Sequence, residues 1–183
     1  MKKLIIPFAV LLTLVTLMSS CKKVVTAVFP GVDVQVPQVV ITVPPLIMVP
    51  PNEVSLGTYS TSFNLDSIVR ANTAGVFNAN DISSVRVKTI TVAVQNSDNL
   101  NNLSNFEYAR LTISSSSNSS EANIATINFP DVASSTQTAT TDNSPDLRAY
   151  LNGNQLSYNV YGKLRKPTTK SLNVAVNITM RIE

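Results

Sequence analysis

Alternation of apolar and polar residues runs through most of the chain after residue 31, and this period of two is typical of β-strands with one buried face. The longest regular runs lie near the C-terminus. Two stretches alternate strictly, from Leu156 to Leu164 and from Leu172 to Ile182. Because the turn-forming residues Pro167 to Lys170 separate them, the pattern predicts a β-hairpin with one buried face.

Shorter segments with the same period predict five further strands. They span residues 32–43, 53–65, 85–95, 106–114 and 124–129. Proline cannot donate to a strand ladder, so Pro37 predicts that the first is an edge strand with a bulge, and Gly57 predicts a register shift in the second. With about seven strands joined by polar loops, we expect an all-β fold, an antiparallel β-sandwich over residues 32–183.

One or two short helices are expected between the strands. Asp66 is a candidate N-cap for a helix that ends near Gly75. The order Ser144-Pro145-Asp146 places a cap residue before a first-turn proline and predicts a second helix. The segments 96–105, 114–120 and 130–143 are rich in Asn, Ser or Thr, and we expect them to be loops.

The first twenty residues have a different pattern and are predicted to be a signal peptide. Lys2 and Lys3 form a positive start, an almost unbroken apolar run extends from Leu4 to Met18, and small residues precede the only cysteine, Cys21. The apolar run is shorter than the roughly 18 to 20 residues that cross a bilayer, so a permanent transmembrane helix is the weaker interpretation. An ordinary cleaved signal with an incidental cysteine is the alternative.

The segment Leu17-Met18-Ser19-Ser20-Cys21 resembles the lipobox of bacterial lipoproteins, with Met18 at a position where Leu is usual. The resemblance implies that Cys21 is lipidated and becomes the acylated N-terminus, and that residues 21–31 form a tether. Several acyl chains, at about 0.8 kcal/mol per buried CH₂, anchor a protein firmly. No Asp and no acidic run follows Cys21, so similarity to small Gram-negative lipoproteins implies the outer membrane, facing the periplasm, with the cell surface as the alternative.

Composition excludes several classes of function. A single Cys excludes a disulfide framework, and the lack of His excludes a zinc site built on His and Cys. Without His, acid–base catalysis near neutral pH would need another group with a shifted pKa. The chain also has no G-x-S-x-G, P-loop or dinucleotide motif. We therefore expect no enzymatic activity, no cofactor and no metal site.

Charge is nearly balanced once residues 1–20 are removed, because 12 basic and 11 acidic residues remain. A nucleic-acid partner is therefore not expected. Lys22 and Lys23 directly follow the predicted anchor and would lie among anionic headgroups. The expected partners are the membrane, reached through the N-terminal lipid, and an envelope protein or a glycan.

Candidate binding residues lie in and after the strand 156–164. Four cations cluster at the tip of the predicted hairpin and could contact lipid phosphates or an acidic glycan: Lys163, Arg165, Lys166 and Lys170. Cations at tips and edges also keep sheets from pairing with neighbours, which is the alternative. Tyr161 falls on the polar phase of its strand and is the candidate for stacking on a sugar ring.

Two weaker motifs offer other chemistry. Asp98, Asn99 and Asn101, and separately Asp142, Asn143 and Asp146, carry oxygen ligands that suit Ca²⁺. Neither spacing matches a defined calcium loop, and Asn and Asp also stabilise turns. The tripeptide Asp66-Ser67-Ile68 resembles an O-glycosylation acceptor of exported bacterial proteins, with Ser67 in a first helical turn as the alternative.

Two functions follow as hypotheses. The first is a non-catalytic outer-membrane lipoprotein that acts as a structural or binding module. The alternative is a glycan-binding or adhesin module at the cell envelope, whose contact surface consists of the loops 96–105 and 130–143.

Overall fold

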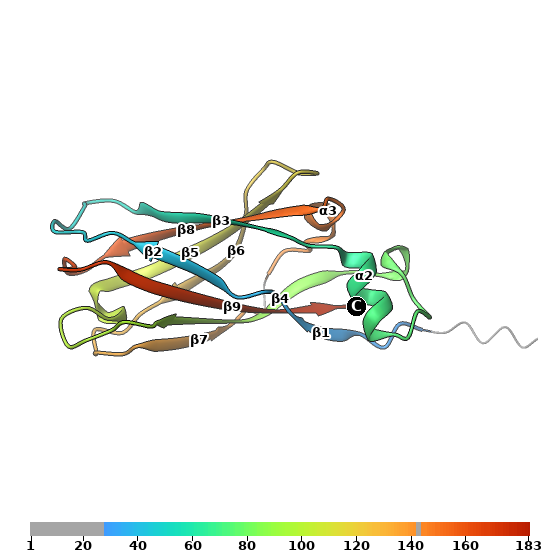
Figure 1. The fold of residues 1–183 in the computed structure, drawn as a ribbon, viewed down its shortest axis with the longest axis horizontal. Helices are drawn as coiled ribbons and strands as arrows, with labels where there is room; N and C mark the ends of the chain where they lie inside the picture. Colours follow the sequence, from blue (N-terminus) through green and yellow to red (C-terminus); the bar gives the residue numbers. More distant parts are fainter. Residues whose placement is uncertain (1–27, 142–143) are drawn as a thin grey trace, which may run out of the picture.

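The computed structural model describes residues 28–141 and 144–183. The predicted signal peptide, Cys21 and the calcium candidates Asp142 and Asn143 lie outside the described residues. Two antiparallel sheets face each other across a single core (Figure 1), which confirms the predicted β-sandwich.

Nine strands form the two sheets. Sheet A has the order β1-β9-β4-β7, with β2 also beside β9, and sheet B has the order β3-β8-β5-β6. Sheet A contains β1 (Val32–Gln35), β2 (Val39–Val43), β4 (Val85–Val94), β7 (Thr136–Thr140) and β9 (Leu172–Ile182). Sheet B contains β3 (Val54–Ser62), β5 (Phe106–Ser115), β6 (Ala122–Asn128) and β8 (Gln155–Leu164).

The structure has two strands more than the sequence predicted. The expected edge strand 32–43 is divided at Pro37 into β1 and β2, which both pair with β9. The predicted loop 130–143 contains β7, whose residues 136–140 alternate Thr with Gln and Ala and offer no strongly apolar face. The register shift predicted at Gly57 is confirmed, since pairing of β3 with β8 shifts between Ser55 and Gly57.

The predicted C-terminal hairpin is wrong, because β8 and β9 belong to different sheets. β8 pairs with β3 and β5, whereas β9 pairs with β1, β2 and β4. The connection 165–171 crosses from one sheet to the other. Its buried Thr168 exchanges hydrogen bonds with Leu46, through the Thr168 amide (2.9 Å) and hydroxyl (2.8 Å), so contacts with another loop hold this connection.

Both predicted helices exist, but each begins at another residue than expected. Helix α2 (Leu65–Asn72) is capped by Asn64, whose Oδ1 accepts from the Ser67 amide at 2.8 Å. Asp66 lies inside the helix and pairs with Arg70. Helix α3 (Arg148–Leu151) has Leu147 as its N-cap and no side-chain cap. Two 3₁₀ turns, η1 (Ala79–Asp81) and η2 (Leu103–Asn105), complete the elements of the described residues.

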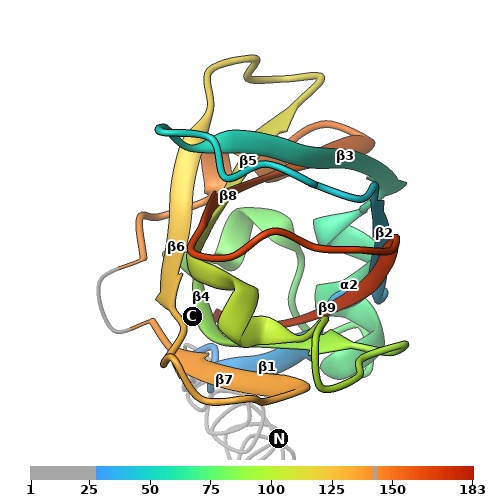
Figure 2. The same ribbon diagram turned by 90° about the vertical axis from the view of Figure 1, so that its left-hand side faces the viewer.

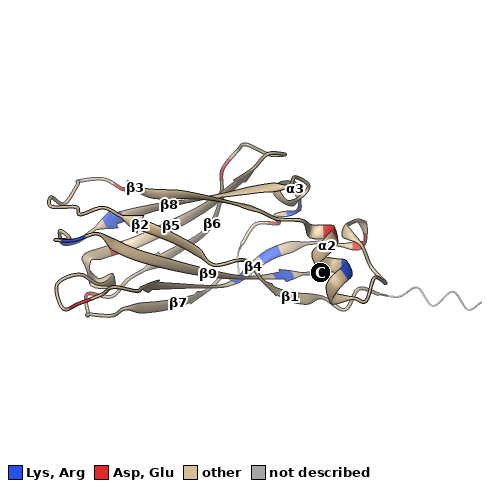
Figure 3. Cartoon of the chain, viewed as in Figure 1, with Lys and Arg blue, Asp and Glu red and all other residues tan. Residues whose placement is uncertain are grey.

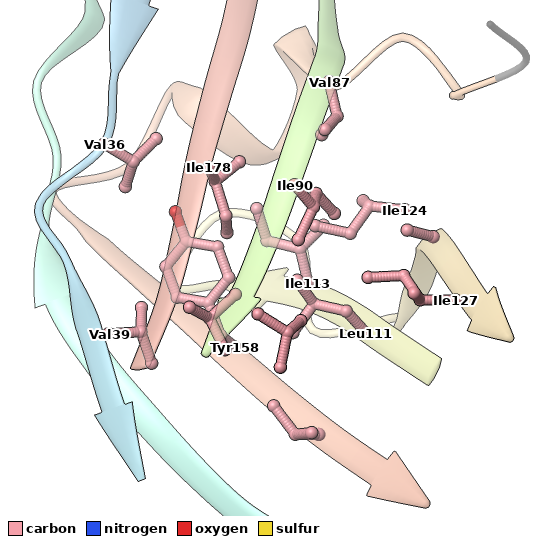
Figure 4. Packing of buried hydrophobic residues seen from close by; sticks show 14 of the residues in the cluster. Val36, Val39, Val87, Ile90, Leu111, Ile113, Ile124, Ile127, Tyr158 and Ile178 are labelled. Atoms are coloured by element: carbon pink, nitrogen blue, oxygen red, sulfur yellow. The ribbon is translucent and has the colours of Figure 1, made fainter. Parts of the chain in front are cut away.

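The core lies between the sheets, where inward side chains of both layers meet (Figure 4). Tyr158 is fully buried among them, near Val36 and Ile178. Burial raises the pKa of Tyr158 well above its ordinary value, and its hydroxyl has no hydrogen-bond partner among the residues that the structure describes. The Tyr158 hydroxyl is therefore a buried polar group that forms no hydrogen bond with these residues.

The two ends of the sandwich differ. The α2 end holds the first described residues, helix α2, the segment 73–84 and the C-terminus (Figure 1). The loop end is formed by the connections 44–53, 95–105, 129–135 and 165–171 (Figure 2). Each strand of about ten residues spans roughly 33 Å, so the two ends lie far apart.

Candidate functional site

The outer face of sheet B carries a connected group of polar side chains around Tyr161. The antiparallel register of β5 and β8 places Arg110 opposite Tyr161 and Thr112 opposite Asn159. Two carboxylates from the segments that lead into β3 and β6 join them. We call this group the Tyr161 network, and its members are Glu53, Arg110, Thr112, Glu121, Asn159 and Tyr161.

Glu121 is the acceptor at the centre of one half of the network. The Tyr161 hydroxyl donates to its Oε1 at 3.0 Å and to its Oε2 at 3.2 Å. The Asn159 amide donates to Oε1 at 3.0 Å, and the buried Thr112 hydroxyl donates to Oε2 at 2.7 Å. These bonds hold the Tyr161 ring in one orientation, and the bond to Glu121 raises the pKa of Tyr161.

Arg110 forms the other half of the network. Its guanidinium lies over the Tyr161 ring, with Cζ 4.3 Å from the ring centroid. It also binds Glu53 through two nitrogens, with Nη2 2.5 Å from Oε1 and Nε 3.1 Å from Oε2. This charge-assisted pair lowers the pKa of Glu53 and raises the pKa of Arg110.

This arrangement suits binding better than proton transfer. Arg110 covers one face of the Tyr161 ring, which is only partly exposed, and its charge is paired with Glu53. Glu121 is held by the uncharged donors of Thr112, Asn159 and Tyr161. Fixed donors and acceptors on a flat sheet face can exchange hydrogen bonds with a polyhydroxylated ligand, as carbohydrates require. The structure therefore places the predicted residue Tyr161 among five partners that the sequence analysis did not single out.

The four predicted anion-contact cations all have partners within the protein, in or beside the connections 44–53, 95–105 and 129–135. The Lys163 ammonium donates to the carbonyls of Pro50 and Pro51. Lys166 pairs with Asp131 at 2.5 Å and Lys170 with Asp98 at 2.6 Å, and the side chains of both lysines are well exposed. Figure 3 shows the resulting mixture of cations and anions at the loop end. Contact of these cations with an external anion stays a prediction.

Arg165 differs from the three lysines because its guanidinium holds backbone. Its Nη1 donates to the carbonyls of Ser104 (3.0 Å) and Phe106 (2.8 Å), and its Nη2 donates to that of Phe129 (2.9 Å). These carbonyls belong to η2, β5 and the segment after β6. Arg165 thus joins three segments at the loop end.

The first calcium candidate is an asparagine-rich turn with its own hydrogen bonds. Asp98 Oδ1 accepts from the amides of Leu100 (2.9 Å) and Asn101 (2.8 Å). The Lys170 ammonium, followed by Asn101, lowers the pKa of Asp98. Within residues 28–141 and 144–183, no three His, Cys, Asp or Glu side chains are grouped so as to hold a metal ion.

The candidate glycosylation site and the possibility of a membrane-spanning helix can both be compared with the described residues. Ser67 is exposed in the first turn of α2, and its amide is the donor to the Asn64 cap. No helix in the part of the chain that the structure describes is both long and apolar enough to cross a membrane.

A small apolar cavity of about 30 Å³ lies between the sheets toward the loop end. It is lined by apolar side chains, among them Ile90, Leu111 and Val176. A cavity of this size has room for about one water-sized probe. This cavity is therefore too small for a sugar ring.

Comparison by sequence finds no protein family whose model matches the chain and no characterised protein that matches it. Among solved structures, the family 32 carbohydrate-binding module of C. perfringens NanJ, in complex with galactose, covers 70% of this chain and 99% of its own, with 13% identity and a TM-score of 0.31. FlhE covers 83% and 96%, with 9% identity and a TM-score of 0.35. The BFDV capsid protein covers 84% and 98%, with 7% identity and a TM-score of 0.31. At such scores, these likenesses carry no argument about function.

Proposed function

We propose that the protein is a non-catalytic lipoprotein of the bacterial outer membrane, anchored by lipid on Cys21, whose β-sandwich acts as a structural or binding module. The observation that carries the proposal is the position of the only cysteine. It follows a basic start, an apolar run and two serines, an order typical of exported proteins, and Leu17 to Cys21 resembles the lipobox of bacterial lipoproteins apart from Met18.

The position of the folded domain supports this proposal. Strand β1 begins at Val32, eleven residues after Cys21, and the buried core extends from Val36 to Ile182. A lipid on Cys21 would therefore be joined to the sandwich through a short segment, as in a tethered module. The chain enters the sandwich at the α2 end, which leaves the loop end free to meet a partner.

Substitution of Cys21 tests the anchor. For the full chain expressed in a Gram-negative host, we expect mass spectrometry to show an acylated Cys21 at the N-terminus and fractionation to place the protein in the outer membrane. Cys21→Ser should abolish the acyl mass and release the protein from the membrane, because no other thiol is present.

A second thiol provides the matched control for this experiment. Ser62 is exposed at the end of β3, so Cys21→Ser combined with Ser62→Cys restores one thiol away from the lipobox. We expect this double variant to remain unacylated. A wild-type protein without acyl mass, or a Cys21→Ser variant that stays in the outer membrane, would contradict the proposal.

A glycan-binding module is the second candidate, and the Tyr161 network is the observation that favours it. The network presents a partly exposed aromatic ring beside fixed amide, hydroxyl and guanidinium groups. Aromatic rings and planar hydrogen-bonding groups are the usual means of recognising sugars.

Removal of the Tyr161 ring tests this second candidate. On a glycan array, we expect Tyr161→Ala to weaken binding of any recognised sugar at least about tenfold, which corresponds to about 1.4 kcal/mol. Thr91→Ala changes the outer face of the opposite sheet and should leave binding unchanged. Failure of the wild-type protein to bind any glycan would refute this candidate. If Tyr161→Ala and Thr91→Ala weaken glycan binding equally, the sugar does not bind at the Tyr161 network.

A further inference from the structure

The α2 end carries two exposed apolar side chains next to the point where the described chain begins. Val28 is 85% exposed and Val76 is 65% exposed. Their neighbours Phe29 and Phe77 contact each other edge to face, with ring centroids 5.3 Å apart, so the two segments lie side by side. Val28 and Val76 therefore extend from neighbouring segments at this end.

A tight turn projects Val76, and neither segment carries a charged side chain of its own. The Arg181 guanidinium lies beside Gly31, and Asp66 Oδ1 accepts from the Ala79 amide at 3.1 Å. Ala74 and Gly75 both have positive φ, at 50° and 78°, and form the tight turn that precedes Val76. Residues 24–32 and 71–80 contain no Asp, Glu, Lys or Arg. Charged side chains that would oppose insertion into an apolar environment are therefore absent from both segments.

The length of chain before Val28 limits how far this end can lie from the anchor. Val28 lies seven positions after Cys21, and a fully extended chain covers at most about 3.5 Å per residue. The α2 end must then lie within about 25 Å of a lipidated Cys21. Lys22 and Lys23 follow the anchor and favour contact with anionic headgroups.

We propose that the α2 end rests on the bilayer that holds the Cys21 lipid, with Val28 and Val76 inserted among the headgroups. This inference depends on the lipid anchor proposed above. The sandwich then stands away from the membrane along its long axis and presents the loop end outward. That end has its own exposed apolar side chains, which would meet a partner beyond this bilayer: Ile47, Met48, Val49, Leu100 and Val132.

Site-specific fluorescence on the lipidated full chain tests this orientation. The thiol of Cys21 is consumed by lipidation, so Val76→Cys supplies a single site for an environment-sensitive dye. Val132→Cys supplies the matched control, because Val132 is 68% exposed, like Val76, but lies at the loop end. Both proteins are reconstituted into vesicles of phosphatidylethanolamine and phosphatidylglycerol.

We expect the dye at residue 76 to shift to shorter wavelength, to brighten about twofold on reconstitution and to be quenched by spin-labelled lipid. The dye at residue 132 should not change. Equal spectra at the two sites, or a response only at residue 132, would overturn the inference. If the dye at residue 76 is quenched by dyes on other copies of the protein but not by spin-labelled lipid, a second copy covers the α2 end. That result would also overturn the inference.

Mass spectrometry of the same samples separates this inference from the proposed function. If acyl mass is present and the dye at residue 76 does not respond, only the orientation is wrong. If acyl mass is absent, both the anchor and the orientation that depends on it are wrong.

Discussion

Replacement of Arg165 by Met is expected to lower the free energy of unfolding by about 3 kcal/mol, because three backbone carbonyls lose a charged donor at once. The carbonyls of Ser104, Phe106 and Phe129 all accept from the Arg165 guanidinium, at 2.8 to 3.0 Å. Methionine keeps much of the apolar length of the side chain and removes the guanidinium donors together with their charge. Urea denaturation followed by circular dichroism measures the difference.

Lys166→Met provides the control for Arg165→Met, because it removes the neighbouring cation. The Lys166 side chain is 52% exposed and its partner Asp131 is 56% exposed, so this ion pair contributes at most about 1 kcal/mol. We expect the midpoint of unfolding to fall much more for Arg165→Met than for Lys166→Met. Equal losses would show that Arg165 does not hold the three segments together.

This contrast illustrates what the charge pattern could and could not predict. The sequence placed Lys163, Arg165, Lys166 and Lys170 together at one tip, and they do lie at or near the loop end. Their partners come from segments far away in the sequence, such as Asp131 and the carbonyls of Pro50 and Pro51. A cluster of cations in sequence therefore did not reveal which of them hold backbone and which form exposed ion pairs.

The period of two predicted most strands because most strands of this sandwich bury one face, which β7 does not. The same period could not assign strands to sheets. β8 and β9 bury alternate residues whether they pair with each other or face each other across the core, so the hairpin and the observed crossover have the same pattern. Only the strand pairings distinguish them, since β8 pairs with β3 and β5 whereas β9 pairs with β1, β2 and β4.

The Tyr161 network shows a similar limit. Alternation placed Tyr161 on the outer face correctly, since it pairs opposite Arg110 on the polar side of sheet B. Its partners could not be found from spacing, because Glu53 lies 57 residues from Arg110 and Glu121 lies 40 residues from Tyr161. The register of β5 with β8, together with the pairing of β3 with β8 and of β6 with β5, brings these groups together.

The asparagine-rich segment 95–105 was expected to be a polar loop, but several of its asparagine side chains are buried and hydrogen-bonded. Asn101, Asn102 and Asn105 are all buried, at 2%, 3% and 3% exposure. Asn101 and Asn105 both bond residues of the crossover, Thr169 and Pro167. Asn105 Oδ1 accepts from the Asn102 amide at 2.8 Å, and its Nδ2 donates to the carbonyls of Leu100 (3.0 Å) and Pro167 (2.7 Å). One side chain thus joins the β4–β5 connection to the crossover between the sheets.

Asn105→Ala is therefore expected to lower the free energy of unfolding by about 3 kcal/mol, because it leaves a buried amide and two carbonyls without their partner. Asn99→Ala, an exposed position in the same segment, should change stability by less than about 0.5 kcal/mol. Hydrogen exchange should show faster exchange at the Asn102 amide and in residues 165–171 of Asn105→Ala. If both variants unfold at the same urea concentration, the buried asparagines do not hold the loop end, and the crossover must be fixed by other contacts.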